Sequence, residues 1–405
     1  MRFVSISPCA LSGVVEVPPS KSLLHRGLVC AALSGDLSRC VLPAEDALSD
    51  DIRVTRDCLR RLLGGGEGAE PLHLFCGESG TTLRLLVPLL AARGVEAVLD
   101  GSGRLPERPM AEYQTAFQGR GVALDFLVKG RVLPLRIRGR LAPGRFTLPG
   151  NVSSQYISGL LLALPLLEGD SDIILSSPLE SEPYVDMTLD VMRHFGVTAT
   201  RTAAGCHVPG RQRCQAASAY VPEPDFSQAA FWRLAAFLGQ GVAVANLPAR
   251  TSQGDSAFAG MLERLAADAD GEPRVFDVSQ TPDLVPALAA AAASARGETR
   301  LANAARLRLK ESDRLASTAA MLHSFGVAVE ALPDGLVVHG ADRRLRGGTV
   351  DGCRDHRIVM AAAMLATRAD GATTILGSDA VAKSYPTFFQ DFRHAGGIAH
   401  EFDMG

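Results

Sequence analysis

Six short polar clusters stand directly before apolar, Ala- and Leu-rich stretches, and these are the first places where the chain could do chemistry. They are Ser20-Lys21-Ser22, Ser79-Gly80-Thr81, Ser153-Ser154-Gln155, Phe226-Ser227-Gln228, Pro282-Asp283 and Asp355-His356-Arg357. Such clusters are typical of helix N-termini, where unpaired backbone N–H groups and the helix dipole favour an anion. For a single cluster, helix capping and phosphate binding both remain possible roles of the hydroxyl groups.

Cationic side chains near these clusters indicate sites for small anions. Lys21 stands at a helix start, where the helix dipole disfavours a cation, and Ser22 and Arg26 share a helical face. Arg84 follows the second cluster inside an apolar helix, and Arg108 lies in a stiff loop bounded by prolines. An arginine held rigidly suits bidentate binding of carboxylate or phosphate. The alternative is that these cations lie on the solvated surface and bind no ligand.

The densest charged segment is Arg306-Leu307-Arg308-Leu309-Lys310-Glu311-Ser312-Asp313-Arg314. If it is helical, Lys310 and Arg314 share a face and Glu311 is rotated by about 100° from Lys310. The segment would then present two cations and a carboxylate to one cleft, with an exposed charged helix start as the alternative. Lys383 is a further cation close to the C-terminus.

The periodicity of apolar residues predicts an α/β chain. Strands are expected at residues 13–17, 97–99, 133–138, 172–175, 241–245 and 373–376, and helices at 23–33, 82–92, 156–167, 229–238, 284–295, 315–325 and 358–367. The last three polar clusters follow the first three at a near-constant separation of about 200 residues, which indicates two similar halves of three units each. The prolines of Val221-Pro222-Glu223-Pro224 are consistent with a boundary there.

Composition excludes several classes of protein. The 405 residues carry a net charge of −3, so no bulk basic field could recruit nucleic acid or an anionic membrane. Aromatic residues make up only 5%, which disfavours base- or sugar-stacking platforms. We find neither a signal peptide nor an apolar stretch long enough to span a membrane, and we expect a cytosolic protein. The eight scattered cysteines are expected to be free thiols, and no His/Cys spacing predicts a metal site.

Taken together, the motifs resemble the 5-enolpyruvylshikimate-3-phosphate synthase family, the 3-phosphoshikimate 1-carboxyvinyltransferases of aromatic amino-acid biosynthesis. The resemblance runs from about residue 18 to residue 390, and the Lys-Glu-Ser-Asp-Arg stretch is its most specific part. The matching motifs, in the family's order, are Pro19-Ser20-Lys21-Ser22 with Arg26, Gly80-Thr81-Thr82-Leu83-Arg84, Arg108-Pro109, Ser153-Ser154-Gln155, Arg308-Leu309-Lys310-Glu311-Ser312-Asp313-Arg314, Asp355-His356-Arg357 and Lys383.

The resemblance implies a fold of two similar lobes. Each lobe would consist of three βαβαββ units, an inside-out α/β barrel whose helix N-termini face the cleft between the lobes. Residues 20–222 would form the first lobe, mainly the shikimate 3-phosphate side. Residues 1–19 and 223–405 would form the second, with the proton-transfer residues and much of the phosphoenolpyruvate site.

The resemblance also implies the reaction. The enolpyruvyl group of phosphoenolpyruvate is transferred to the 5-hydroxyl of shikimate 3-phosphate by addition and elimination, and phosphate is released, without metal or organic cofactor. The expected partners are these two small molecules, with neither nucleic acid nor membrane, and the protein is expected to be a monomer. In physical terms, two substrates that carry phosphates and carboxylates repel each other strongly in a water-poor cleft, and many fixed cations offset that repulsion.

Site residues carry over position by position. Asp283 would be the base toward the attacking hydroxyl, Glu311 would transfer protons to and from the enol methylene, and Lys21 would take part in catalysis. Shikimate 3-phosphate would be bound by Lys21, Ser22, Arg26, Ser153, Ser154, Gln155, Ser181, Tyr184, Asp283 and Lys310. Phosphoenolpyruvate would be bound by Lys21, Gly80, Arg108, Gln155, Arg314, His356, Arg357 and Lys383.

Two positions depart from the family pattern. Many members have Asn-Ala-Gly-Thr where this chain has Glu78-Ser79-Gly80-Thr81, and we expect Glu78 to pair with a cation rather than to touch substrate. Where members often have Asn, four residues before the Lys of the Lys-Glu-Ser-Asp-Arg motif, this chain has Arg306, so no substrate contact is assigned there.

Three other functions remain as alternatives. The UDP-N-acetylglucosamine enolpyruvyl transferases share the fold, but they typically have an N-terminal Lys-Asn pair and a Cys in the loop that corresponds to residues 101–109, and this chain lacks both. A P-loop phosphotransferase is suggested only by the glycine-rich residues 64–68, which no Gly-Lys-Ser/Thr follows. A catalytically silent scaffold of the same fold is disfavoured by the presence of Asp283, Glu311, Lys21 and Lys383.

Overall fold

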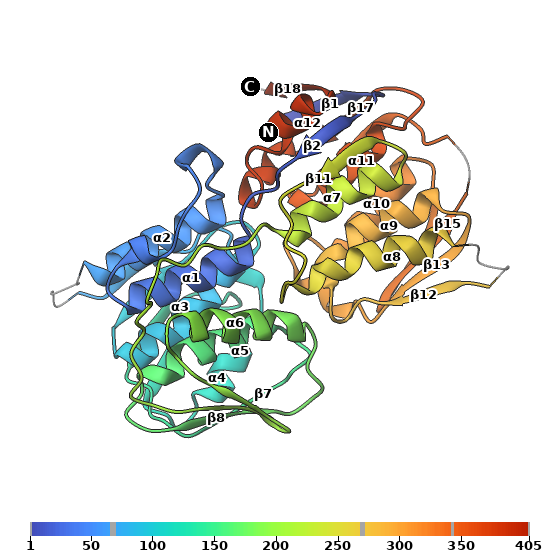
Figure 1. The fold of residues 1–405 in the computed structure, drawn as a ribbon. Helices are drawn as coiled ribbons and strands as arrows, with labels where there is room; N and C mark the ends of the chain where they lie inside the picture. Colours follow the sequence, from blue (N-terminus) through green and yellow to red (C-terminus); the bar gives the residue numbers. More distant parts are fainter. Residues whose placement is uncertain (1, 65–69, 268–271, 342–343, 404–405) are drawn as a thin grey trace. The chain divides into compact units, whose positions relative to one another are not determined.

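The computed structural model describes residues 2–64, 70–267, 272–341 and 344–403, and the chain divides into two compact units (Figure 1). The terminal unit comprises Met1–Ser20, Ala44–Ser49 and Pro224–Gly405, and the middle unit comprises Lys21–Pro43 and Asp50–Glu223. Of the glycine-rich residues 64–68, all but Gly64 lie outside the described residues.

The middle unit contains two four-stranded sheets with their helices. The first sheet, in the order β3-β4-β6-β5, is formed by β3 (Leu72–Phe75), β4 (Ala97–Asp100), β5 (Val122–Phe126) and β6 (Leu135–Gly139), with α3 (Gly80–Arg93) and α4 (Ala111–Ala116). The second, in the order β7-β8-β10-β9, is formed by β7 (Arg145–Leu148), β8 (Ser171–Leu175), β9 (Thr200–Thr202) and β10 (Gly205–Val208), with α5 (Ser154–Ala163) and α6 (Glu182–His194). Helices α1 (Lys21–Leu33) and α2 (Asp50–Leu63) pack against each other.

The terminal unit repeats this arrangement. One sheet is formed by β12 (Arg274–Asp277), β13 (Gly297–Ala302), β15 (Gly335–Gly340) and β14 (Ala328–Leu332), with α9 (Val285–Ser294) and α10 (Arg314–Ser324). The other is formed by β16 (Gly348–Asp351), β17 (Thr373–Leu376), β1 (Arg2–Ser7) and β18 (Ile398–Asp403), with α11 (His356–Ala366) and α12 (Phe388–His394). Helices α7 (Phe226–Phe237) and α8 (Phe258–Ala266) accompany a two-stranded parallel sheet of β2 (Ser12–Val15) and β11 (Gly241–Val244).

All four larger sheets share one topology, which explains the internal repeat. In each, a parallel pair of strands is extended by an antiparallel strand and that strand's antiparallel neighbour. In the last sheet the N-terminal strand β1 takes the third place, between β17 and β18, so both chain ends lie in one sheet (Figure 1). The third part of each half contains the helix pair α1/α2 or α7/α8, and in the terminal unit the parallel strands β2 and β11 accompany that pair.

The six polar clusters do begin helices, as predicted. They begin α1, α3, α5, α7, the 3₁₀ turn Pro282–Leu284 that leads into α9, and α11. At four of these starts a side-chain oxygen accepts a hydrogen bond from a backbone N–H of the first turn, namely at Ser79, Ser153, Asp225 and Asp355. Capping therefore occurs at these clusters, and it stabilises a helix end by about 1 kcal/mol.

The prediction that Lys310 and Arg314 share one face of a helix is wrong. A short 3₁₀ helix, Ala305–Leu309, ends before Lys310, and α10 begins only at Arg314. Asp313 is the N-cap and accepts a hydrogen bond from the backbone N–H of Ala316 at 3.1 Å. The cap forces an extended approach to the helix, so Lys310 and Glu311 lie on irregular backbone.

The core of the terminal unit is made by helices that are apolar on nearly every side. Most residues of α9 and α11 are fully buried, and these helices pack against each other and against α7. A helix that is hydrophobic all round belongs inside a protein, and alanines allow the helix axes to approach closely. None of the helices in the described ranges has the length and hydropathy needed to cross a membrane. All eight cysteines are free thiols.

Candidate active site

In the middle unit, the starts of α5 and α6 carry the predicted phosphate-binding serines. Ser153 caps α5 and accepts a hydrogen bond from the backbone N–H of Gln155 at 3.3 Å, and the buried Ser154 is the first helical residue. Ser181 precedes α6 in the left-handed conformation, with φ 55° and ψ 40°, and its side chain does not cap the helix. A non-glycine residue held there is strained, which is a frequent feature of ligand sites. Two helix N-termini with three hydroxyls suit a phosphate group.

Arg26 of α1 is almost entirely engaged by protein acceptors. It is 2% exposed, and its Nε donates to Thr188 Oγ1 at 2.7 Å. Nη1 donates to the Ser22 carbonyl at 2.7 Å, while Nη2 donates to Ser158 Oγ at 3.1 Å and to the Tyr184 carbonyl at 3.0 Å. Its hydrogen bonds to the described part of the chain use four of the five N–H donors, which leaves one Nη1 hydrogen for a ligand carboxylate. Burial lowers the pKa of Arg26 to about 10, so it stays charged at neutral pH.

Two predicted phosphoenolpyruvate residues of this unit, Lys21 and Gly80, begin α1 and α3. Lys21 Nζ forms an ion pair with Asp51 Oδ2 at 2.8 Å. The buried Arg108 lies across the backbone of Gly80, where a Cβ would come within 2.6 Å of Nη1 and 2.7 Å of Cζ. Gly80 is therefore required for the close approach of the guanidinium to the helix start.

Gly80→Ala is expected to displace Arg108 and to raise the KM for phosphoenolpyruvate by about 10- to 100-fold. Steady-state kinetics measured with each substrate varied in turn would detect the change. Gly260→Ala in α8 is the control, because a Cβ there meets nothing within 4 Å. Equal KM values in the two variants would contradict this role of Gly80.

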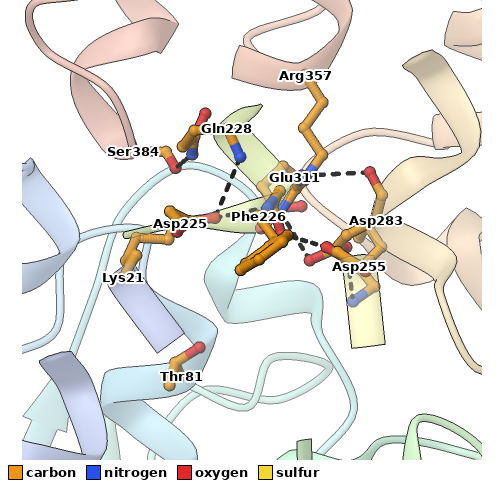
Figure 2. A network of polar contacts seen from close by, with 12 residues as sticks. Lys21, Thr81, Asp225, Phe226, Gln228, Asp255, Asp283, Glu311, Arg357 and Ser384 are labelled. Atoms are coloured by element: carbon orange, nitrogen blue, oxygen red, sulfur yellow. Dashed lines mark hydrogen bonds and ion pairs between the residues drawn. The ribbon is translucent and has the colours of Figure 1, made fainter. Parts of the chain in front are cut away.

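In the terminal unit, Asp283 interacts with three cations, and Figure 2 shows it beside Arg357. Its Oδ1 accepts from Arg314 Nη1 at 3.0 Å and lies 3.8 Å from Lys310 Nζ. Its Oδ2 accepts from Arg357 Nη2 at 2.7 Å, and its backbone carbonyl accepts from Nη1 of the same arginine at 3.2 Å. Three cations from the segment before α10 and from the starts of α10 and α11 thus converge on one carboxylate.

Arg314 is the buried link of this network. Its side chain is 1% exposed, and its Nη2 donates to Glu311 Oε2 at 2.6 Å. Its Nε donates to Asp355 Oδ2 at 2.9 Å, and Asp355 also caps α11 by accepting from the Arg357 N–H at 3.0 Å. The two carboxylates predicted to transfer protons, Asp283 and Glu311, therefore share one guanidinium.

The environment shifts the pKa values of the network. Burial opposes ionisation of Asp283, but Arg357, Lys310 and Arg314 outweigh it and lower the pKa of Asp283 far below its usual range. Burial lowers the pKa of Lys310 to about 8, although Asp283 opposes that shift. Asp283 is therefore ionised at neutral pH. The Lys310 ammonium loses its proton at a pH slightly above neutral.

We expect kcat/KM for shikimate 3-phosphate to fall above about pH 8, because the Lys310 ammonium loses its proton there. Lys310→Arg should remove this limb, and a pH profile of both proteins would test it. The same shift implies that the free energy of unfolding rises between about pH 8 and pH 10.5, because in that window the unfolded chain binds the proton and the folded chain does not. If kcat/KM of Lys310→Arg still fell above about pH 8, the fall would have to come from another titrating group.

The remaining predicted residues are placed as follows. His356 is buried as the first residue of α11, and Lys383 Nζ donates to the Arg354 carbonyl at 2.9 Å. The side chain of Glu78 packs closely against Gly103. A Cβ added to Gly103 would lie 2.4 Å from Glu78 Cδ. Arg306, to which no substrate contact was assigned, donates from Nη2 to the backbone carbonyl of Ser279.

Three carboxylates that contact the predicted site residues were assigned no role in the site from the sequence. Asp51 pairs with Lys21, Asp355 pairs with Arg314, and the buried Asp255 accepts a hydrogen bond from the Ser227 hydroxyl. Burial, with Asp283 nearby, raises the pKa of Asp255 to about 7. An Asp before an apolar stretch indicated that Asp355 caps a helix, but no local signal pairs it with Arg314, because that pairing joins two separate helix starts.

The sequence matches the family model described as "EPSP synthase (3-phosphoshikimate 1-carboxyvinyltransferase)" over residues 7–392. The chain belongs to the EPSP synthase family. Two relatives named 3-phosphoshikimate 1-carboxyvinyltransferase, from Clostridium acetobutylicum and Clostridium kluyveri, are 39% and 38% identical to it, with full coverage of both chains. This family member is therefore an enolpyruvyl transferase of the shikimate pathway.

Solved structures agree with this family membership. An EPSP synthase from Acinetobacter baumannii superposes with a TM-score of 0.77 at 25% identity, with full coverage of both chains. The enolpyruvyl transferase NikO from Streptomyces tendae superposes with a TM-score of 0.74 at 16% identity, over 100% of this chain and 99% of its own. The predicted fold class, the two-lobe α/β fold of the enolpyruvyl transferases, is confirmed.

Proposed function

We propose that the two groups of residues described above serve one reaction, in which the enolpyruvyl group of phosphoenolpyruvate passes to the 5-hydroxyl of shikimate 3-phosphate. The observation that carries the proposal is the sharing of Arg314 by Asp283 and Glu311 beside Lys310 and Arg357. Such a group offers two proton-transfer carboxylates among cations that can bind an anionic substrate. Family membership supports the same reaction.

The middle unit is proposed to hold shikimate 3-phosphate. Its phosphate would lie against the starts of α5 and α6, bound by Ser153, Ser154 and Ser181. Its carboxylate would use the remaining Nη1 hydrogen of Arg26. Ser22, Gln155, Tyr184 and Lys21 of this unit would bind its other polar groups, and Asp283 and Lys310 of the terminal unit are proposed to contribute to the same binding.

Phosphoenolpyruvate is proposed to bind to cations that form ion pairs with carboxylates of the protein. Lys21 is paired with Asp51, and Arg314 and Arg357 are both paired with Asp283. An anionic substrate would compete for these cations, with Arg108, Gly80, Gln155, His356 and Lys383 completing its site. Because Arg314 and Arg357 lower the pKa of Asp283, their engagement by phosphoenolpyruvate would raise it and make Asp283 a better base.

The addition step would need two proton transfers. The 5-hydroxyl oxygen attacks C2 of the enolpyruvyl group, Asp283 accepts the hydroxyl proton, and Glu311 delivers a proton to the methylene carbon. In the elimination, Glu311 takes a proton back from the resulting methyl group as the C–O bond to phosphate breaks, and the proton held by Asp283 passes to the departing phosphate. Two carboxylates in different electrostatic surroundings suit these two roles.

Purified protein should release phosphate from phosphoenolpyruvate only when shikimate 3-phosphate is added. A colorimetric phosphate assay with the acceptor, with UDP-N-acetylglucosamine and with no acceptor would test this. Release with UDP-N-acetylglucosamine would instead favour the related sugar-nucleotide transferase. Binding of both substrates without any release would favour a silent scaffold. A monomeric state and a cytosolic location remain predictions.

A further inference from the structure

Arg84 of α3 is a buried arginine whose guanidinium contacts three parts of the middle unit. It is 4% exposed, and Nη1 donates to Gln155 Oε1 of α5 at 2.7 Å. Nη2 donates to the Pro109 carbonyl at 3.2 Å, and Cζ lies 5.0 Å from the ring centre of Tyr156. The carbonyl and the ring hold the guanidinium, so it is a rigid donor toward Gln155.

The side-chain amide of Gln155 is held at both ends. Its Oε1 accepts from Arg84, and its Nε2 donates to Thr81 Oγ1 at 2.8 Å. If the amide rotated by 180°, its NH₂ group would face the guanidinium, and two donors would oppose each other. Arg84 therefore decides which amide atom faces the start of α3.

The surrounding packing keeps Arg84 in place. Tyr113 OH donates to the Arg84 carbonyl at 2.7 Å and to the Tyr156 carbonyl at 3.0 Å, which ties α3 to α5. Tyr156 OH donates to the same Pro109 carbonyl that Arg84 contacts. Among the described residues, the groups that accept hydrogen bonds from the guanidinium of Arg84 are the Gln155 amide oxygen and the Pro109 carbonyl, so its bonds are made to neutral groups of the protein.

We propose that Arg84 is a positioning residue, which fixes the amide of Gln155 for substrate binding. The inference rests on the proposed role of Gln155 in binding both substrates. It assigns the guanidinium of Arg84 to protein acceptors rather than to bidentate binding of a substrate anion. Lysine cannot replace it, because one ammonium group cannot reach Gln155 and the Pro109 carbonyl in the fork geometry of a guanidinium.

The test compares Arg84→Met with a matched control, Arg120→Met. Arg120 also donates to two backbone carbonyls, of Pro143 at 2.9 Å and of Arg145 at 2.8 Å, and lies 5.3 Å from the ring centre of Phe146. It contacts no predicted site residue. Arg84→Met should lower kcat/KM for phosphoenolpyruvate by about 10- to 100-fold, whereas Arg120→Met, at a partly buried position, should leave it unchanged.

A double-mutant cycle with Gln155→Ala separates positioning from general loss of structure. If Arg84 acts through Gln155, Arg84→Met has little further effect on kcat/KM once Gln155 is truncated. Equal losses in both backgrounds, or wild-type kinetics in Arg84→Met, would overturn the inference. If Arg84→Met does not fold, Arg84→Lys provides the same cycle with the charge kept. Failure of the proposed function would appear in the wild-type protein as absence of acceptor-dependent phosphate release.

Discussion

Asp283→Asn is expected to lower kcat by about 10²- to 10⁴-fold, the usual contribution of a general base. The amide has nearly the same shape as the carboxylate and can still accept from Arg314 or Arg357, but it cannot take the proton of the attacking hydroxyl. The substitution also leaves Lys310, Arg314 and Arg357 without their shared counter-charge. Steady-state kinetics should therefore show a lower kcat with a KM for phosphoenolpyruvate that is unchanged or reduced.

This separation of kcat from KM distinguishes a base from a structural residue. Asp277→Asn is the control, because Asp277 lies in the same unit and accepts from the Ser279 N–H at 2.8 Å and from Asn303 Nδ2 at 2.9 Å. It should leave both constants unchanged. A raised KM at unchanged kcat in Asp283→Asn would mean that Asp283 only holds the cations in place.

Arg314→Met should have the largest combined effect on stability and binding. It removes the cation that contacts Asp283, Glu311 and Asp355, and Asp355 is 0% exposed. Breaking a buried ion pair from one side costs about 3–5 kcal/mol, because the carboxylate left behind stays buried without compensation. We expect urea unfolding to show this loss and calorimetry to show no measurable binding of phosphoenolpyruvate.

Arg393→Met is the matched control for stability. Arg393 pairs with Glu401 at 2.8 Å in the same unit, but the two side chains are 44% and 42% exposed. Such an exposed pair contributes at most about 1 kcal/mol, so its loss should be small. If both variants lost the same stability, the network around Arg314 would not behave as a buried one. Arg314→Lys should recover part of the stability, since it keeps the charge.

Local signals account for what could be predicted of the fold. The apolar stretch before residue 295 predicted α9, and capping residues such as Ser79 and Asp355 marked where α3 and α11 begin. These signals are local because capping involves residues within one turn, and because burial of a whole helix requires apolar residues on all its faces. The break at Lys310 was missed, since Asp313 caps α10 from inside a segment that reads as continuous helix.

The candidate site was predictable to a smaller extent. The residue types and their order, compared with a known family, predicted Asp283, Glu311 and Arg314 as members, and in the structure these three side chains are in contact. The residue types and their order did not indicate that Asp51 pairs with Lys21 or that Asp255 is buried beside Asp283. Arg84 was expected to suit an anion, yet its guanidinium is occupied by Gln155 and Pro109. Such contacts join residues far apart in the chain, and no short-range pattern encodes them.

The sequence by itself determined the α/β class, the six helix starts, the internal repeat and the family. Each follows from the order of residue types along the chain, because caps, periodicity and motifs are properties of neighbouring residues. Only the tertiary structure decided the charge state and the partners of the site residues. Asp283 has a depressed pKa because three cations from separate segments meet it, and Asp255 has a raised one because burial removes its water. Burial and charge proximity exist only once the chain has folded.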